Sequence, residues 1–351
     1  MQIDVLLVGQ GLAGSLLAWE LTQRKFRVLV VDNGAENASR VAAGVVNPVT
    51  GQRLVIQPNL EQLLPAAMAL YRQLAEYFRQ EFYVAMPMLK IIRSAKERAL
   101  VEQRLVNTVY QHYLDGWFTV AQGMNAPNGV LRQRHTGYLK TELLLNQLRD
   151  FLTNKGCYRQ EEMNFSDIRL EPDLAWRGIE ARHIVFCEGH RALANPWFGG
   201  LPFQVVKGEI LGCESHADLP RQILNYGHWL VPVADRQFKT GASFEPGRLD
   251  PVPTPQARQI LLDSLNSVCP GYRPVNIFQH RAGIRPATLD KHPFIGTHPR
   301  YRQLHIFNGF GAKGSLTIPW YAAKFADYLL RRGDLPLGSD IRRYHATHFP
   351  A

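Results

Sequence analysis

The first thirty-two residues show two hydrophobic periods in succession. Strand-length apolar runs cover residues 3–8 and 27–31, and short runs of this kind, bounded by glycine or polar residues, indicate buried strands. Between them, leucines recur at the spacing of one helical face, at Leu12, Leu16, Leu17 and Leu21. The pattern therefore predicts a strand, a helix and a second strand, and the second strand ends at Asp32.

Strand-length apolar runs and helical spacing of apolar residues also predict the elements of the rest of the chain. Residues 60–80 carry a strong amphipathic pattern, with apolar side chains on a single helical face. For the helix at 141–154, Thr141 is the expected N-cap and Gly156 the expected stop. Further helices are predicted over 95–107, 256–269 and 316–331, and strands over 184–187, 203–213, 223–233, 237–244 and 304–308.

Strand-rich blocks at 80–133 and 203–274 are predicted to form a second domain. Their alternating apolar residues are typical of an antiparallel or mixed sheet, and a proline-rich loop over 245–255 precedes the one helix of the second block. A length of 351 residues allows two domains or one composite domain with a sizeable core.

Glycines follow the first strand in the spacing G-x-G-x-x-G, at Gly9, Gly11 and Gly14. Gly9 permits the turn, Gly11 lets a pyrophosphate approach the backbone, and Gly14 lets the helix pack closely on the strand. The helix N-terminus offers N–H groups to phosphates, and Asp32 is placed to accept hydrogen bonds from ribose hydroxyls. The motif predicts dinucleotide binding without separating FAD from NAD, and the alternative is a loop with chance glycines.

Two further segments are rich in small residues and suit close approach to a flat ligand. Residues 39–51 read S-R-V-A-A-G-V-V-N-P-V-T-G, which is too apolar for an ordinary solvated loop. The alternative for this segment is a buried crossover packed on a sheet. Residues 309–314 read G-F-G-A-K-G and precede the predicted helix at 316–331, so a second glycine-rich turn opens a second helix.

Composition is that of an ordinary globular protein. No apolar stretch approaches the ~20 residues that span a bilayer, and the first strand begins too early for a signal or transit peptide. The cysteines are widely spaced and form no C-x-x-C pair, at Cys157, Cys187, Cys213 and Cys269. We therefore expect reduced thiols in a cytoplasmic protein, with no disulfide framework and no metal site.

A net charge of +10 admits two interpretations. The charge serves an acidic partner, such as a nucleic acid or an anionic substrate, or it belongs to a surface that is merely solvated. Lysines and arginines are scattered, and no run of five like charges occurs. This scatter favours the solvated surface.

Five segments of the chain carry a resemblance to a known family. The chain resembles the D-amino-acid oxidase family of FAD-dependent oxidoreductases, which includes glycine oxidase and sarcosine oxidase. The resemblance implies an α/β fold with a Rossmann-like FAD-binding domain at 1–79, 134–202 and 275–351, interrupted by a mixed or antiparallel substrate domain at 80–133 and 203–274. The segments are V-G-Q-G-L-A-G at 8–14 with Asp32, S-R-V-A-A-G at 39–44, I-V-F-C-E-G at 184–189, G-I-R-P-A-T-L-D-K-H-P-F-I-G at 283–296 and N-G-F-G-A-K-G-S-L-T-I-P at 308–319.

The same resemblance implies FAD and assigns its contacts by position. The glycine turn and Asp32 would hold the ADP half, residues 39–40 would lie near the pyrophosphate, residues 43–44 near the flavin ring, and residues 309–314 around its pyrimidine end. The implied cofactor residues are Gly9, Gly11, Leu12, Ala13, Gly14, Asp32, Asn33, Ser39, Arg40, Ala43, Gly44, Gly189, Gly309, Gly311, Lys313, Gly314 and Ser315.

Three residues are candidates for catalysis. Arg285 matches the arginine that grips the substrate carboxylate in the amino-acid oxidases, and Trp229 matches a tyrosine that faces the substrate there. Tryptophan cannot relay a proton as that tyrosine can. Lys313 is a candidate for adding charge near the flavin or activating oxygen, with a solvated loop lysine as the alternative. Ala287 lies in the segment where sarcosine oxidases bond a cysteine to flavin, so the FAD is expected to be non-covalent.

The expected reaction depends on the orientation of the substrate carbon toward the flavin more than on a catalytic base. Hydride leaves the carbon next to a nitrogen for flavin N5, and no base need touch that carbon if the amine arrives neutral. Arg285 can clamp a carboxylate through two parallel hydrogen bonds, and the alternative is a structural salt bridge. The histidines at 190, 228, 280 and 292 are expected to be structural or surface residues.

Three classes of function remain open from the sequence. The first is an oxidase or dehydrogenase of a small amino acid or secondary amine, with O2 or an unknown electron acceptor. The second is a tRNA-modifying flavoenzyme, because the chain also resembles the oxidative domain of the bacterial enzyme that trims carboxymethylaminomethyl-uridine; no RNA-binding module supports it. The third is a non-catalytic flavoprotein subunit, against which Arg285 argues. The sequence leaves the oligomeric state unknown.

Overall fold

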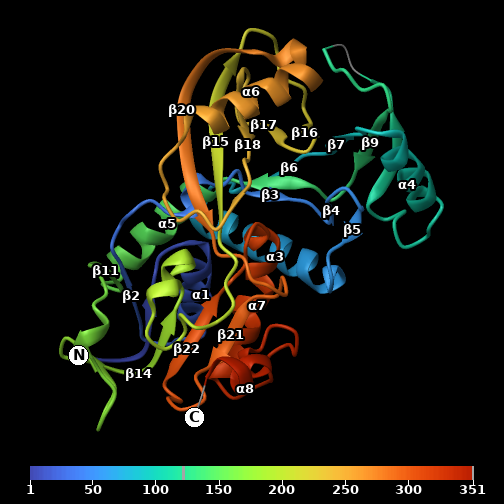
Figure 1. Ribbon diagram of the computed structural model, residues 1–351. Helices are drawn as coiled ribbons and strands as arrows, with labels where there is room; N and C mark the ends of the chain where they lie inside the picture. Colours follow the sequence, from blue (N-terminus) through green and yellow to red (C-terminus); the bar gives the residue numbers. More distant parts are fainter. Residues whose placement is uncertain (121–122, 350–351) are drawn as a thin grey trace.

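Two large sheets divide the protein in the computed structural model, which describes residues 1–120 and 123–349. Figure 1 shows the mainly parallel sheet with α1 and α7 at the bottom of the view, together with both termini, and the second sheet with α6 at the top. This arrangement confirms the predicted α/β fold class. No helix in the described part of the chain has the length and apolar character needed to cross a membrane.

The lower sheet has eight strands. The carboxyl ends of its central parallel strands lie side by side. Four strands, β2, β1, β14 and β22, run parallel side by side, and Val8 lies opposite both Val31 and Phe186. The glycine turn after β1 therefore lies beside the ends of β2 and β14. The strands are β1 (Gln2–Val8), β2 (Val28–Asp32), β11 (Tyr158–Gln160), β12 (Ile168–Arg169), β13 (Ala175–Trp176), β14 (Ile179–Phe186), β21 (Phe294–Thr297) and β22 (Leu304–Asn308).

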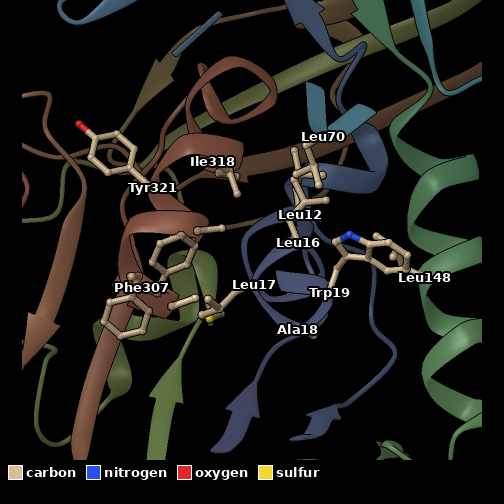
Figure 2. Packing of buried hydrophobic residues seen from close by; sticks show 14 of the residues in the cluster. Leu12, Leu16, Leu17, Ala18, Trp19, Leu70, Leu148, Phe307, Ile318 and Tyr321 are labelled. Carbon is tan, nitrogen blue, oxygen red and sulfur yellow. The ribbon is translucent and has the colours of Figure 1, made fainter. Parts of the chain in front are cut away.

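Four helices share one hydrophobic core with this sheet: α1 (Leu12–Gln23), α3 (Leu60–Phe78), α5 (Thr141–Asn154) and α7 (Gly314–Leu329). Figure 2 shows Leu12 and Trp19 of α1 between Leu70 of α3, Leu148 of α5 and Ile318 of α7. The leucine spacing of α1 and the amphipathic pattern at 60–80 thus fold as predicted, because their apolar faces have one another to pack against. A second core forms around Trp176, Phe186 and Phe198.

The upper sheet has nine strands, and its longest pair is β15 with β20. Helix α6 (Pro255–Val268) packs on it through Leu261 and Leu265. The strands are β7 (Met88–Ile91), β8 (Leu114–Phe118), β9 (Val130–Gln133), β15 (Val206–Ser215), β16 (Ile223–Asn225), β17 (Trp229–Pro232), β18 (Gln237–Gly241), β19 (Glu245–Pro246) and β20 (Pro274–Arg285).

Short elements join the two large sheets. The strands β3 (Val45–Val46), β10 (Gly137–Leu139) and β6 (Tyr83–Ala85) form a small sheet, and β4 (Val49–Thr50) pairs with β5 (Val55–Ile56). The remaining helices are α2 (Ala38–Val41), α4 (Ala95–Leu105) and α8 (His345–His348).

Two local features differ from the expectation, at Thr141 and at residues 223–233. Thr141 is not an N-cap: Lys140 holds that position, and the Thr141 hydroxyl instead donates to the carbonyl of Ala42 at 3.0 Å. The single strand predicted at 223–233 is a hairpin of β16 and β17. The domain boundary placed at residue 275 falls at the start of β20, which pairs along β15 in the upper sheet; the division into two domains stays a prediction.

Candidate active site

A cavity of about 510 Å³ opens where the two sheets meet. From the lower sheet it is lined by the ends of β1, β2 and β22 and by the residues directly after β14, and from the upper sheet by β15, β17 and β20. The first turns of α1 and α7 also line it, and the first turn of any helix leaves N–H groups without partners inside the helix. The cavity therefore combines the strand edge typical of nucleotide sites with two positive helix ends.

Each glycine of the G-x-G-x-x-G turn has a geometric reason. Gly9 has φ of +105°, and a Cβ there would lie 2.6 Å from the carbonyl oxygen of Cys187. A Cβ on Gly14 would lie 1.9 Å from the carbonyl oxygen of Gly9, so only glycine lets α1 pack against the turn. Gly11 lines the cavity and has room around it. These contacts are the ones that the motif requires.

Asp32 ends β2 at the cavity and also organises the turn. Its carboxylate accepts from the backbone N–H of Gln10 and of Gly34, each at 2.8 Å. Ser39 also stabilises the turn, because its hydroxyl accepts a hydrogen bond from the backbone N–H of Leu12, the first residue of α1, at 3.0 Å. A carboxylate and a hydroxyl thus hold the loop in shape at the cavity wall.

The structure gathers most of the sequence-predicted site residues around this one cavity. The predicted residues that line it are Gly9, Gly11, Leu12, Ala13, Asp32, Asn33, Ser39, Ala43, Gly44, Gly189, Trp229, Arg285, Gly311, Gly314 and Ser315. The other four do not line it: Gly14, Arg40, Gly309 and Lys313.

Two of those four are cations: Arg40 was expected near the pyrophosphate, and Lys313 was expected to add charge near the flavin or to activate oxygen. The Arg40 guanidinium donates to Asn146 at 2.8 Å. The Lys313 ammonium donates to the side chain of Gln57, and burial lowers its pKa. Both cations therefore have protein partners away from the cavity wall, so a direct catalytic part for Lys313 lacks support in this geometry.

Arg285 lies at the end of β20 with its guanidinium over the neighbouring strand. A Cβ on Gly208 of β15 would lie 2.0 Å from its Nη2 atom. Its one hydrogen bond to the described chain is a long one, 3.5 Å to the carbonyl oxygen of Ser243, and no described carboxylate forms an ion pair with it. Burial lowers the pKa of Arg285. A partly buried guanidinium without an anion is costly, so the arrangement favours an anionic ligand.

Apolar residues line the same cavity as this guanidinium on the side of the upper sheet, at Ile210, Trp229 and Ala242. His228, next to Trp229, turns its Nδ1 to the carbonyl oxygen of Ala242 at 3.1 Å. His280 reaches Glu209 at 2.7 Å, within a buried network outside the cavity lining. Among the four histidines considered above, only His190 lines the cavity.

Sequence reasoning missed several residues of this site, and two of them bear on its chemistry. Gly208 clears the space for Arg285, and Glu188 lines the cavity directly after β14. An acidic residue at the end of a predicted buried strand was a readable signal for Glu188. No local signal could mark Gly208, because its role depends on the pairing of β15 with β20 across more than seventy residues.

The residues present fit a dinucleotide cofactor. A Cβ on Gly189 would meet no atom within 4 Å, and the glycine-bounded ends of α1 and α7 both face the cavity. Such N-termini bind phosphate and other anionic groups through their N–H groups. Together with the parallel sheet and Asp32, these features define a dinucleotide-binding protein of the Rossmann-like class.

Comparison with known proteins names the family within this class. Residues 4–328 match the family described as DAO, FAD dependent oxidoreductase, so the chain belongs to this family and its cofactor is FAD. The resemblance drawn from the sequence is thereby confirmed, as is the expectation of an oxidoreductase that holds FAD non-covalently.

Two relatives of this chain illustrate the names that its relatives carry. It is 24% identical to a glycine oxidase of Geobacillus kaustophilus, over 94% of this chain and 93% of that protein. It is 23% identical to the tRNA 5-methylaminomethyl-2-thiouridine biosynthesis bifunctional protein MnmC of Marinobacter nauticus, over 93% of this chain and 56% of that protein. The chain thus spans just over half the length of the bifunctional relative.

Solved structures show the same fold over the whole chain. The crystal structure of glycine oxidase from Geobacillus kaustophilus superposes with a TM-score of 0.83, at 22% identity and with 100% of each chain covered. Iminodiacetate oxidase from Chelativorans sp. BNC1 superposes with a TM-score of 0.80, at 20% identity, covering 97% of this chain and 98% of that one.

Proposed function

We propose that this enzyme oxidises the C–N bond of a small amino acid or secondary amine that carries one carboxylate. The observation that carries the proposal is the Arg285 guanidinium, which lines the cavity without a described carboxylate partner. A guanidinium fork binds a carboxylate through two parallel hydrogen bonds and so fixes both its position and its angle. The names of the relatives, glycine oxidase and iminodiacetate oxidase, agree with this substrate class.

The apolar wall beside Arg285 narrows the class further. Ile210, Trp229 and Ala242 offer no second cation. The other arginine of the cavity lining, Arg191, pairs with Glu162, so a second carboxylate on the substrate would be buried without a partner. We therefore favour a substrate with a single carboxylate over a dicarboxylate such as iminodiacetate. Trp229 would form an aromatic wall against the substrate and would not transfer a proton.

Chemistry and positioning are divided between cofactor and protein. FAD, when bound, supplies a hydride acceptor for the carbon next to the substrate nitrogen. Arg285 orients that carbon by holding the carboxylate, and the apolar wall excludes water from it. The helix dipole at the start of α7 favours negative charge at the cavity wall.

The test compares substrates that differ only in the carboxylate. Glycine is compared with methylamine, and sarcosine with dimethylamine, by anaerobic bleaching of the flavin absorbance, which needs no knowledge of the electron acceptor. We expect reduction only by the carboxylate-bearing member of a pair. Bleaching at equal rates by both members of each pair would refute the carboxylate requirement.

Variants of Arg285 test whether this residue is the group that requires a carboxylate on the substrate. Arg285→Lys keeps the charge but loses the planar fork, and a displacement of about 1 Å can cost roughly a hundredfold in rate. Arg285→Ala should be slower still, because the carboxylate would be desolvated without a partner. Both variants should keep the flavin absorbance spectrum. Equal rates for the parent and Arg285→Ala would show that the clamp is wrong.

A tRNA-modifying activity is the second candidate. The similarity to MnmC and the net charge of +10 favour it, and its carboxymethylaminomethyl substrate also presents a secondary amine and a carboxylate. Mass spectrometry of tRNA nucleosides from a deletion strain tests it directly. Accumulation of the carboxymethylaminomethyl nucleoside would support this function, and an unchanged nucleoside profile would exclude it.

A further inference from the structure

Glu188 lies where an anionic cofactor would be expected to repel it. It follows β14 at the edge where β1 ends, and it lines the cavity. The position that a Cβ on Gly9 would take lies 3.5 Å from the Cα of Glu188, so the residue adjoins the glycine turn. That turn and the N-terminus of α1 form the phosphate-binding part of the motif.

The carboxyl group of Glu188 has little to stabilise a negative charge. Its one hydrogen bond comes from the side-chain amide of Asn195, at 2.8 Å, and Asn195 is itself buried. The cation that lowers the pKa of Glu188, Arg191, already pairs with Glu162 at 3.1 Å. Burial raises the pKa of Glu188 to about 7, outweighing the Asn195 hydrogen bond and Arg191, which lower it.

The other groups around Glu188 make its neutral form the compatible one. Four more carboxylates line the same cavity, at Asp32, Glu36, Glu161 and Glu162, and of these Glu162 raises the pKa of Glu188. A pyrophosphate brings further negative charge to this edge, and like charges in a poorly solvated site disfavour ionisation. A neutral carboxyl, in contrast, can donate its O–H to a phosphate or hydroxyl oxygen.

Two other titratable groups touch this part of the cavity. Burial lowers the pKa of His190, so its imidazole stays neutral at and above pH 7. Burial raises the pKa of the Cys187 thiol well above its ordinary value, so it also stays neutral. Glu188 is therefore the group in this corner whose charge changes around neutral pH.

We propose that Glu188 is a cofactor-binding residue that acts in its protonated form, so that FAD binding takes up one proton. The inference concerns the cofactor alone and does not depend on the identity of the substrate. It predicts that the protein holds FAD more weakly as the pH rises above neutrality, because the carboxyl must then be protonated during binding.

The first measurement is the dissociation constant of FAD, from titration of the FAD-free protein between pH 6.0 and 8.5. For the parent we expect a rise of roughly tenfold or more between pH 7.0 and 8.5. Glu188→Gln keeps the size and a donor but does not titrate, so its constant should change by less than about twofold over that range. Glu36→Gln is the matched control, because Glu36 lines the same cavity but is paired with Arg281; it should keep the slope of the parent.

The second measurement needs no variant. Calorimetric titration of the parent with FAD at pH 8.0, in two buffers of different ionisation enthalpy, gives the number of protons taken up, which we expect to be about one. No proton uptake would overturn the proposal, as would a Glu188→Gln protein that keeps the pH slope of the parent. If Glu188→Gln fails to fold, the proton count decides.

Discussion

At the scale of the single residue, the missing side chain of Gly208 leaves the space that the guanidinium of Arg285 occupies. A Cβ there would lie 2.0 Å from Nη2 of Arg285. Because that atom is the far end of a flexible side chain, we expect Gly208→Ala to fold and to bind FAD, with the guanidinium displaced. A shift of about 1 Å can cost roughly a hundredfold in rate, so flavin reduction by a carboxylate-bearing amine should fall steeply while FAD affinity stays the same.

A second glycine on the same strand serves as the control for this prediction. A Cβ on Gly212 would meet the exposed ring of Phe278, at 2.7 Å, and no group of the cavity. Gly212→Ala should therefore keep the rate of the parent to within about twofold. If Gly208→Ala reduced the flavin as fast as Gly212→Ala, the packing of Arg285 on β15 would have no part in catalysis.

The site residues that the sequence could predict are those with a local reason. Gly9, Gly11, Gly14 and Asp32 lie within one strand–helix–strand unit, where spacing alone fixes their neighbours. Lys313 belongs to an equally local motif, yet its partner is Gln57, from a distant hairpin. Side-chain direction across such distances depends on tertiary packing, which a sequence pattern does not contain.

At the scale of elements, the unit of β1, the glycine turn, α1 and β2 depends on Asp32. Its carboxylate accepts from Gln10 and Gly34 at 2.8 Å each and faces the cavity. We expect Asp32→Ala to weaken FAD binding by roughly 1.5–3 kcal/mol, about ten- to 150-fold, because charge-assisted hydrogen bonds are lost. FAD titration of the FAD-free protein measures this effect.

Asp4, on the neighbouring strand β1, provides the control for Asp32. It binds Arg27 at 3.2 Å and does not line the cavity. Asp4→Ala should leave the dissociation constant of FAD unchanged even if it lowers the melting temperature. An Asp32→Ala protein with the FAD affinity of the parent would remove Asp32 from the cofactor site.

Long periodic elements were predictable, and their ends were not. The helix expected at 60–80 is α3 (Leu60–Phe78), since its apolar stripe fits the core. Thr141 is not an N-cap because its hydroxyl donates to the carbonyl oxygen of Ala42, more than ninety residues away. A helix end is fixed by a single hydrogen bond, so one tertiary partner can override the local preference.

For the whole molecule, buried histidines couple stability to pH. Both ring nitrogens of His305 form hydrogen bonds: Nε2 with Nδ1 of His183 at 2.9 Å, and Nδ1 with the hydroxyl of Thr297 at 2.8 Å. Burial lowers the pKa of His183 and takes that of His305 well below its ordinary value. Burial also lowers the pKa of His298 to about 4, and its Nδ1 accepts two backbone N–H groups. All three therefore fold in the neutral form.

The sign of the pH effect follows from these directions. In the folded state each pKa lies below the unfolded value of about 6.5, so the unfolded chain binds more protons as the pH falls through about 6.5. The free energy of unfolding should therefore fall below that pH, by up to about 1.4 kcal/mol per pH unit for each histidine. Urea unfolding of the FAD-saturated enzyme at pH 7.5, 6.0 and 5.0 measures this slope.

A variant assigns part of that slope to the buried pair. His305→Gln keeps hydrogen-bonding groups near Thr297 but cannot titrate, so it should be less stable than the parent at pH 7.5 and lose less free energy of unfolding on the way to pH 5.0. His112→Gln is the control, since His112 is exposed, and it should follow the slope of the parent. If the loss between pH 7.5 and 5.0 were the same for His305→Gln and the parent, the acid sensitivity of the fold would have to arise elsewhere.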